Sequence, residues 1–264
     1  MELTRLRTCL EDDFRLLHSA VTAADPAAKV PSCPDWTTTD LADHVTEVYL
    51  HKTECMRLGA EPDPWPPENP DPAPDRDPVA ALADSYAGLL AEFDARDPAD
   101  HAGSWYKPGQ NVAFWIRRMA QETVVHRVDA ELAAGLEPAE IPEDLAVDGI
   151  EEILVTFVAY SSVTWLEYFA DLLTAPDVRP LHLSTAGHTW SVRATTAGVL
   201  VEQLPSATTL TSSAQPATPA ATVAGTPQNL FLWLWNRADD TTVDQDGDPA
   251  LLAQFRALRV TSTQ

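Results

Sequence analysis

The chain has 264 residues, 45% of them apolar, which is enough to build a core in one large domain or two ordinary ones. Its 40 acidic residues outnumber 17 Lys and Arg, which gives a formal net charge of −23. This charge argues against nucleic acid or an anionic membrane as a partner. The simplest interpretation of the acidic excess is that it keeps the protein soluble. Three cysteines without a C-x-x-C pair argue against a disulfide framework, and no segment resembles a signal peptide or approaches the ~18 apolar residues of a membrane span. We therefore expect a soluble cytoplasmic protein.

Five segments in the first two thirds of the chain show apolar residues every three or four positions, the pattern of amphipathic helices. Thr37 and Asp40 form a capping-box pattern at the start of the second segment, and Gly59 and Gly135 are placed to end the second and the fourth. Antiparallel packing of such helices predicts a bundle. The expected helices run from residue 3 to before Asp25, from Thr37 to Gly59, and over about 79–95, 110–134 and 149–173.

The remainder of the chain changes character twice. Residues 61–78 contain eight prolines, which predicts an extended surface crossover. After Pro176 the segments RPLHLST, HTWSVRAT and GVLVEQLP alternate as half-buried strands do; ATTLTSS is a fourth candidate, and AQPATPAATVAG fits a loop. Thr226-Pro227 and Asp248-Pro249 are typical helix starts. The fold class is thus α+β, with a helical domain at 1–174 and a smaller antiparallel-sheet domain at 175–264.

Three polar side chains fall where the expected bundle should be buried. Glu122 and His126 are one helical turn apart on one face, and His44 lies among apolar residues of another helix. A buried carboxylate needs a partner, and two imidazoles with one carboxylate are the three-ligand set of catalytic zinc sites, which keep one position open. The alternative is that Glu122 pairs with Arg118 or Arg127 at the surface and that both histidines are ordinary core residues. Spacing alone leaves both interpretations open.

Two sequence blocks carry a family resemblance. VPSCPDWTTTDLADHV (30–45) and FWIRRMAQETVVHRVDAE (114–131) resemble the mycothiol-dependent maleylpyruvate isomerase family, whose first domain is a DinB-like four-helix bundle. LFLWLWNRADDTTVDQDGDPALLAQFRAL is similar to that family's sterol-carrier-protein-like second domain, so the resemblance covers almost the whole chain. It implies that His44, Glu122 and His126 hold a divalent metal, typically zinc.

The resemblance also implies mycothiol as the thiol cosubstrate and a small-molecule electrophile as the substrate. A metal with an open position binds a thiol as thiolate and polarises a carbonyl. The expected activity is therefore a metal-dependent thiol transferase or isomerase: the thiolate adds to an electrophilic carbon, then leaves again or stays. We expect a monomer or a small homo-oligomer.

A diacid substrate, as the resemblance implies, calls for a cation in this acidic protein. Arg237, after a Trp-rich helix, is the candidate catalytic arginine, and Arg193 is a lesser one. A favourable interaction of Arg237 with the helix dipole is the simpler interpretation. Cys33 precedes the His44 helix without a neighbouring base, and a packed thiol is the simpler interpretation there too.

Several residues near the ligand positions are candidates for cofactor or substrate contacts. Trp36 is a helix staple or lines the pocket mouth, and His51 lies two turns from His44 on the same face. Tyr106, with Trp105, precedes the fourth helix and either contacts substrate or seals the bundle. Asp129 either orients His126 through a hydrogen bond or pairs with a surface arginine.

Two other functions fit parts of the sequence. A metallohydrolase would use the same two-histidine, one-glutamate set to activate water instead of a thiol. A non-catalytic binding module would hold an apolar ligand near the FLWLW helix, a segment that is more simply core. Thiol dependence separates the first alternative from the leading prediction, and stoichiometric metal separates the second.

Overall fold

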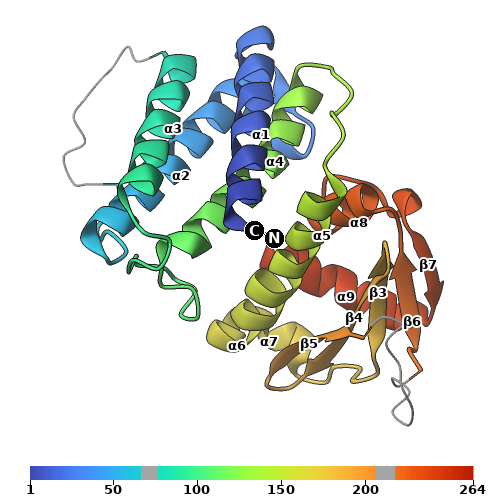
Figure 1. The fold of residues 1–264 in the computed structure, drawn as a ribbon. Helices are drawn as coiled ribbons and strands as arrows, with labels where there is room; N and C mark the ends of the chain where they lie inside the picture. Colours follow the sequence, from blue (N-terminus) through green and yellow to red (C-terminus); the bar gives the residue numbers. More distant parts are fainter. Residues whose placement is uncertain (67–76, 206–217, 264) are drawn as a thin grey trace. The chain divides into compact units, whose positions relative to one another are not determined.

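The computed structural model describes residues 1–66, 77–205 and 218–263 (Figure 1). These residues form two compact units, Met1–Ala139 and Glu140–Gln264. The crossover predicted at 61–78 falls largely outside the described residues, as does the candidate strand ATTLTSS. Each unit is described by itself below.

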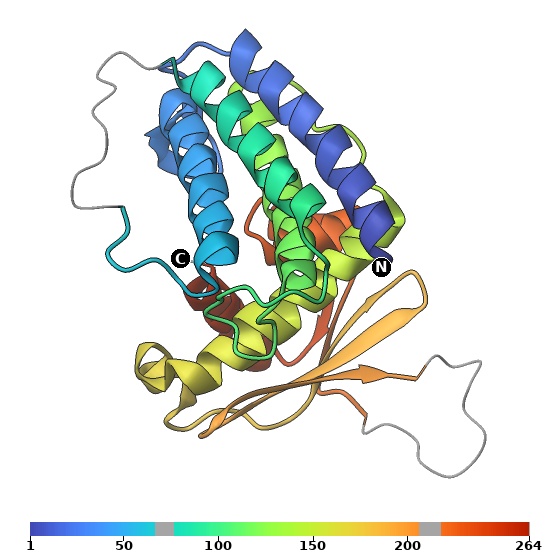
Figure 2. The ribbon, with the colours of Figure 1, turned by 60° about the vertical axis from the view of Figure 1, so that its left-hand side comes forward.

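The first unit is a bundle of four helices that lie side by side (Figure 2). Helix α1 packs against α4, and α2 packs against both α3 and α4. Leu10, Leu41, Leu82 and Val124, one from each helix, are fully buried in the core between them. This unit confirms the helical bundle that the sequence predicted. Its helices are α1 (Leu3–Ala23), α2 (Thr38–Leu58), α3 (Pro78–Ala95) and α4 (Val112–Ala133).

The ends of α2 lie where the sequence placed them. The Thr37 hydroxyl accepts a hydrogen bond from the Asp40 backbone N–H, and the Asp40 carboxylate accepts one from the Thr37 N–H at 2.7 Å. Together these bonds form the predicted capping box and satisfy two amide donors that the helix leaves unpaired. Gly59 ends the helix with a left-handed φ of 65°, a conformation that glycine adopts without steric cost.

The segment before α2 contains a short antiparallel hairpin. Strand β1 (Lys29–Val30) pairs with β2 (Cys33–Thr37). Val30 is fully buried, and contacts between β1 and α4 hold the hairpin against the bundle. Two prolines in PSCP conceal the strand pattern in the sequence, so the hairpin is seen only in the structure.

The second unit contains a five-stranded sheet in the order β5-β4-β3-β6-β7. Strands β3, β4 and β5 are the three strands predicted after Pro176, but β6 lies in the stretch that was expected to be a loop. Strands β3 and β6 pair in parallel, while the other neighbours are antiparallel, so the sheet is not wholly antiparallel as predicted. The strands are β3 (Leu181–Thr185), β4 (His188–Thr195), β5 (Gly198–Leu204), β6 (Ala221–Ala224) and β7 (Asp244–Gly247).

Helices pack against the strands of the second unit (Figure 1). Thr226 and Asp248 cap the two helices predicted near the C-terminus, each with proline at the first helical turn. The helices are α5 (Glu143–Glu152), continued by a π-helix, η1 (Ile153–Tyr160), then α6 (Ser161–Thr164), α7 (Leu166–Leu173), α8 (Pro227–Leu234), a 3₁₀ turn, η2 (Asp240–Thr242), and α9 (Pro249–Ser262).

The boundary between the units differs from the sequence prediction. The helical segment that begins at Glu143 was assigned to the bundle, whereas α5 packs on α8 and η1 packs on β5. The Ser162 hydroxyl also accepts a hydrogen bond from the Val199 N–H at 2.8 Å. An apolar helical face shows that a helix is covered, but not which element covers it. The structure accordingly divides the chain at Ala139/Glu140 rather than after residue 174.

Among the described residues, no single helix is long and apolar enough to cross a membrane. The pair Glu143–Thr164 and Leu166–Leu173 meets that test only when both members are counted together, and they are bent by 92° at the break between them.

Candidate metal centre

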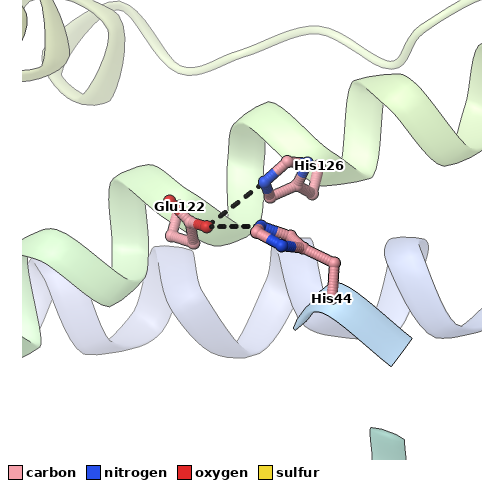
Figure 3. Close-up of side chains that lie close together, drawn as sticks. All are labelled: His44, Glu122 and His126. Carbon is pink, nitrogen blue, oxygen red and sulfur yellow. Dashed lines mark ion pairs between the residues drawn. The ribbon is translucent and has the colours of Figure 1, made fainter. Parts of the chain in front are cut away.

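Side chains from two helices of the bundle converge on one point (Figure 3). Oε1 of Glu122 lies 3.4 Å from Nε2 of His44 and 3.2 Å from Nε2 of His126. Glu122 and His126 project from the same face of α4, and His44 projects from α2. The three ligand atoms lie within 4.8 Å of one another. The structure thus brings together the three residues that the sequence singled out.

Arg118 fixes the orientation of Glu122. Arg118 lies one turn before Glu122 on α4, and its Nη2 donates to Oε2 of Glu122 at 2.5 Å. Oε1 is therefore the oxygen that faces both imidazoles. The arginine side chain is only 4% exposed. The pairing that the sequence offered as a surface alternative therefore exists, but it is buried and orients the carboxylate.

Asp129 fixes the orientation of His126. The Asp129 carboxylate is buried, and its Oδ2 lies 2.9 Å from Nδ1 of His126. The hydroxyl of Ser32, in the turn of the hairpin, donates to the other oxygen of the same carboxylate. In the tautomer in which Nδ1–H donates to Asp129, the lone pair of Nε2 points at the convergence point, as in metal sites that pair histidine with a carboxylate.

The charges in the cluster are strongly coupled. Burial acts to raise the pKa of Glu122, but the positive charges of His126 and Arg118 outweigh it and hold that pKa well below its usual range. Burial acts to lower the pKa of His126, but Glu122 and Asp129 outweigh it and raise that pKa to about 9. A metal ion must displace the proton from Nε2 of His126, because only the neutral imidazole is a ligand.

The donor set fits a divalent cation. A tetrahedral zinc with ligands at 2.0–2.1 Å places its ligand atoms about 3.3 Å apart, and the two distances from Oε1 of Glu122 are 3.2 and 3.4 Å. Imidazole nitrogen and carboxylate oxygen are both ordinary zinc ligands, and three of them leave a fourth position. The side chain of His44 is 35% exposed, so solvent and small molecules can reach the cluster at His44.

Trp36 of the hairpin covers one side of the cluster. Its ring centroid lies 4.7 Å from that of His44 and 6.2 Å from that of His126. The hairpin, held to α4 through Ser32, thus places an aromatic wall beside the ligands. Of the three residues predicted to contact the cofactor, Trp36 is the one that touches the histidine ligands.

The other two predicted contacts lie farther along the helices. His51 is seven residues beyond His44, about 10 Å along α2, where its ring meets Trp65 at 5.1 Å between centroids. Tyr106 lies in the segment before α4 and stacks on Phe114 with 5.4 Å between ring centroids. Both therefore lie toward the opposite end of the bundle from the hairpin.

The remaining candidates are Arg237, Arg193 and Cys33. Nη1 of Arg237, just after α8, donates to the backbone carbonyl of Trp235 at 2.7 Å, a contact expected of a residue at a helix end. Arg193 is exposed on β4. Cys33 is half-buried in β2, and all three cysteines, each within the described residues, lie outside any disulfide.

Replacing Asp129 by asparagine is expected to weaken zinc binding by about 10–100-fold, the usual cost of losing an outer partner of a histidine ligand. Asparagine keeps the size and can still accept the Ser32 hydrogen bond, so the fold should persist. Competition with a chromogenic chelator measures the affinity. An unchanged affinity would show that Asp129 plays no part in orienting His126.

Comparisons with known proteins agree with this architecture. The family model described as Mycothiol maleylpyruvate isomerase N-terminal domain matches residues 7–131, and the MDMPI C-terminal domain matches residues 144–254. A crystal structure of a mycothiol-dependent maleylpyruvate isomerase covers 93% of both chains with a TM-score of 0.60 at 14% identity. A mutant of such an enzyme gives a TM-score of 0.58 at 13% identity over the same shares. At these identities the likeness shows the fold, and none of the curated proteins matches the chain.

Proposed function

The chain belongs to the mycothiol maleylpyruvate isomerase family, and on that premise we propose that it is a divalent-metal-dependent enzyme that adds mycothiol to a small electrophilic substrate. The observation that carries the proposal is the convergence of His44, Glu122 and His126 on one point, with Arg118 and Asp129 holding two of them in place.

His44, Glu122 and His126 hold the cation, most simply zinc. When bound, it supplies thiol activation at neutral pH and polarisation of a carbonyl. Glu122 contributes one anionic oxygen, and its pKa is held well below the usual range by the positive charges of His126 and of Arg118, which bonds its other oxygen. Trp36 excludes water from one side of the imidazoles, which strengthens the electrostatic interactions there.

The proposed reaction is addition of the thiolate sulfur to one carbon of an activated double bond, with a proton taken up at the neighbouring carbon or its carbonyl oxygen. Rotation about the resulting single bond, followed by loss of the proton and the thiolate, returns the double bond in the other geometry and regenerates the thiol. If the thiolate does not leave, the same addition ends as S-transfer.

The test combines metal analysis with thiol dependence. Zinc-loaded protein is incubated with maleylpyruvate in the presence and in the absence of mycothiol, and product is followed by chromatography. We expect one metal ion per chain and product only with the thiol. A chelator should remove activity, and added zinc should restore it.

The other outcomes distinguish the alternatives. Turnover of an ester or amide without thiol would indicate a metallohydrolase, because the same ligand set can activate water. Absence of stoichiometric metal would contradict the proposal and favour a binding module.

A further inference from the structure

Lys52 of α2 is a half-buried cation that takes no part in the candidate metal centre. Its Nζ lies 2.9 Å from Nδ1 of His51 and 5.0 Å from the ring centroid of Trp115. Within the described ranges, no carboxylate forms an ion pair with it. Taking an ammonium group out of water is costly unless an anion compensates it. The groups in direct contact with the ammonium are an imidazole and an aromatic face, while the carboxylates of Glu61 and Glu122 act on it at longer range.

Lys52 and the candidate metal centre both lie at the interface between α2 and α4, which is called the seam below. The Tyr49 hydroxyl and the Thr123 hydroxyl bond across this seam at 2.7 Å, between the two sites. Lys52 follows His44 by eight residues, about 12 Å along the helix. Helical side chains lean toward the helix N-terminus, so the ammonium extends back toward His44.

The electrostatics agree with this placement. Burial lowers the pKa of Lys52, while Glu122 acts to raise it and Arg118 to lower it, so both residues lie within electrostatic reach of the ammonium. Burial and the Lys52 charge lower the pKa of His51 to about 4. His51 is therefore neutral at pH 7 and accepts the lysine hydrogen bond, which leaves other N–H donors of Nζ for a ligand.

Two other cations of these helices are already committed to carboxylates. Arg57 pairs with Glu54 and Glu92, and Arg118 pairs with Glu122. The excess of 40 acidic over 17 basic residues repels an anion at long range, so a local cation is needed to hold one.

We propose that Lys52 binds a carboxylate of the substrate remote from the reacting carbon, and so selects anionic electrophiles. This inference rests on the proposed function, since it takes the reacting end of the substrate to lie at His44, Glu122 and His126. It assigns to the bundle the task for which the sequence suggested Arg237. Lys52 is then a specificity residue, and His51 and Trp115 position its ammonium.

The test is equilibrium binding of a dicarboxylate that undergoes no turnover without thiol. Calorimetry of zinc-loaded protein at pH 7.5 compares maleate with its monomethyl ester. We expect the wild-type chain to prefer the dianion by about 10–100-fold, the value of a hydrogen bond to a charged group. Lys52→Met should remove the preference, and Lys52→Arg should keep part of it.

Arg15→Met is the matched control, because it removes one positive charge from a side chain that is 70% exposed. It should leave the preference intact. A wild-type chain without preference, or a Lys52→Met chain that keeps it, overturns the inference. Thermal unfolding and zinc content show whether each variant is folded, and Lys52→Gln replaces the methionine variant if that one is not.

This readout is independent of turnover. A charge preference that depends on Lys52 in a chain without thiol-dependent turnover would refute the proposed function while supporting the anion site. Thiol-dependent turnover in a chain whose binding ignores Lys52 would refute the anion site alone.

Discussion

Replacing His44 by alanine is expected to abolish stoichiometric zinc binding and thiol-dependent turnover. His44 supplies one of three ligand atoms, and the loss of even an outer partner of a ligand typically costs 10–100-fold in affinity or activity. We therefore expect a loss well above about 100-fold. The fold should survive, because Glu122 keeps its bonds to Arg118 and His126 and the exposed side of the cluster simply opens to water.

Metal analysis after dialysis and thiol-dependent turnover measure the effect, and circular dichroism shows whether the helices persist. His18→Ala is the matched control, since His18 is a helical histidine of the same unit whose ring lies tilted against Phe14. It should retain metal and activity. A His44→Ala chain that still holds one zinc per molecule with wild-type affinity would remove His44 from the ligand set.

The sequence predicted the helical part of the fold because its signals are local. The Thr37–Asp40 capping box and Gly59 act within a few residues, so α2 begins and ends as expected. The same locality explains why Glu122 and His126 could be paired from their spacing. His44 belongs to another helix, where its apolar neighbours made it a third candidate ligand, and the family resemblance favoured that interpretation over an ordinary core histidine.

The features that the sequence did not reveal depend on distant contacts. Nothing in its own segment shows that β6 pairs in parallel with β3 across about 40 residues. In the sequence Lys52 is only a charge on a helix. Its proposed role as an anion-binding residue depends on Trp115 of α4 and on the lack of a carboxylate ion pair in the described part of the chain. Arg118 was recognised as a partner of Glu122, but its burial was not.

Replacing Arg127 by methionine is expected to destabilise the fold at neutral pH by about 3–5 kcal/mol, the usual cost of removing one partner from a buried ion pair. Arg127 is fully buried, and its guanidinium donates to Asp13 of α1 at 3.0 Å and to Glu131 at 2.7 Å. Methionine fills the space but leaves both carboxylates without their cation. The packing of α1 on α4, the helix that carries Glu122 and His126, is the part most affected.

The loss should depend on pH through Asp13. Burial raises the pKa of Asp13 from 3.8 to about 6, although Arg127 opposes the shift. The folded chain therefore binds this proton more tightly than the unfolded chain, and the associated stability, complete below about pH 4, is lost as the pH rises through 6. Without Arg127 the pKa of Asp13 rises further, so acid should restore part of the lost stability.

Urea unfolding of metal-free wild-type and Arg127→Met chains at pH 5 and pH 7.5 measures both effects. The difference between the two chains should be smaller at pH 5, because a protonated Asp13 no longer needs the arginine. Arg15→Met, which breaks an exposed pair with Asp12, should change little at either pH. Equal differences at both pH values would mean that the buried carboxylates stay ionised without Arg127, and that water, rather than the arginine, compensates them.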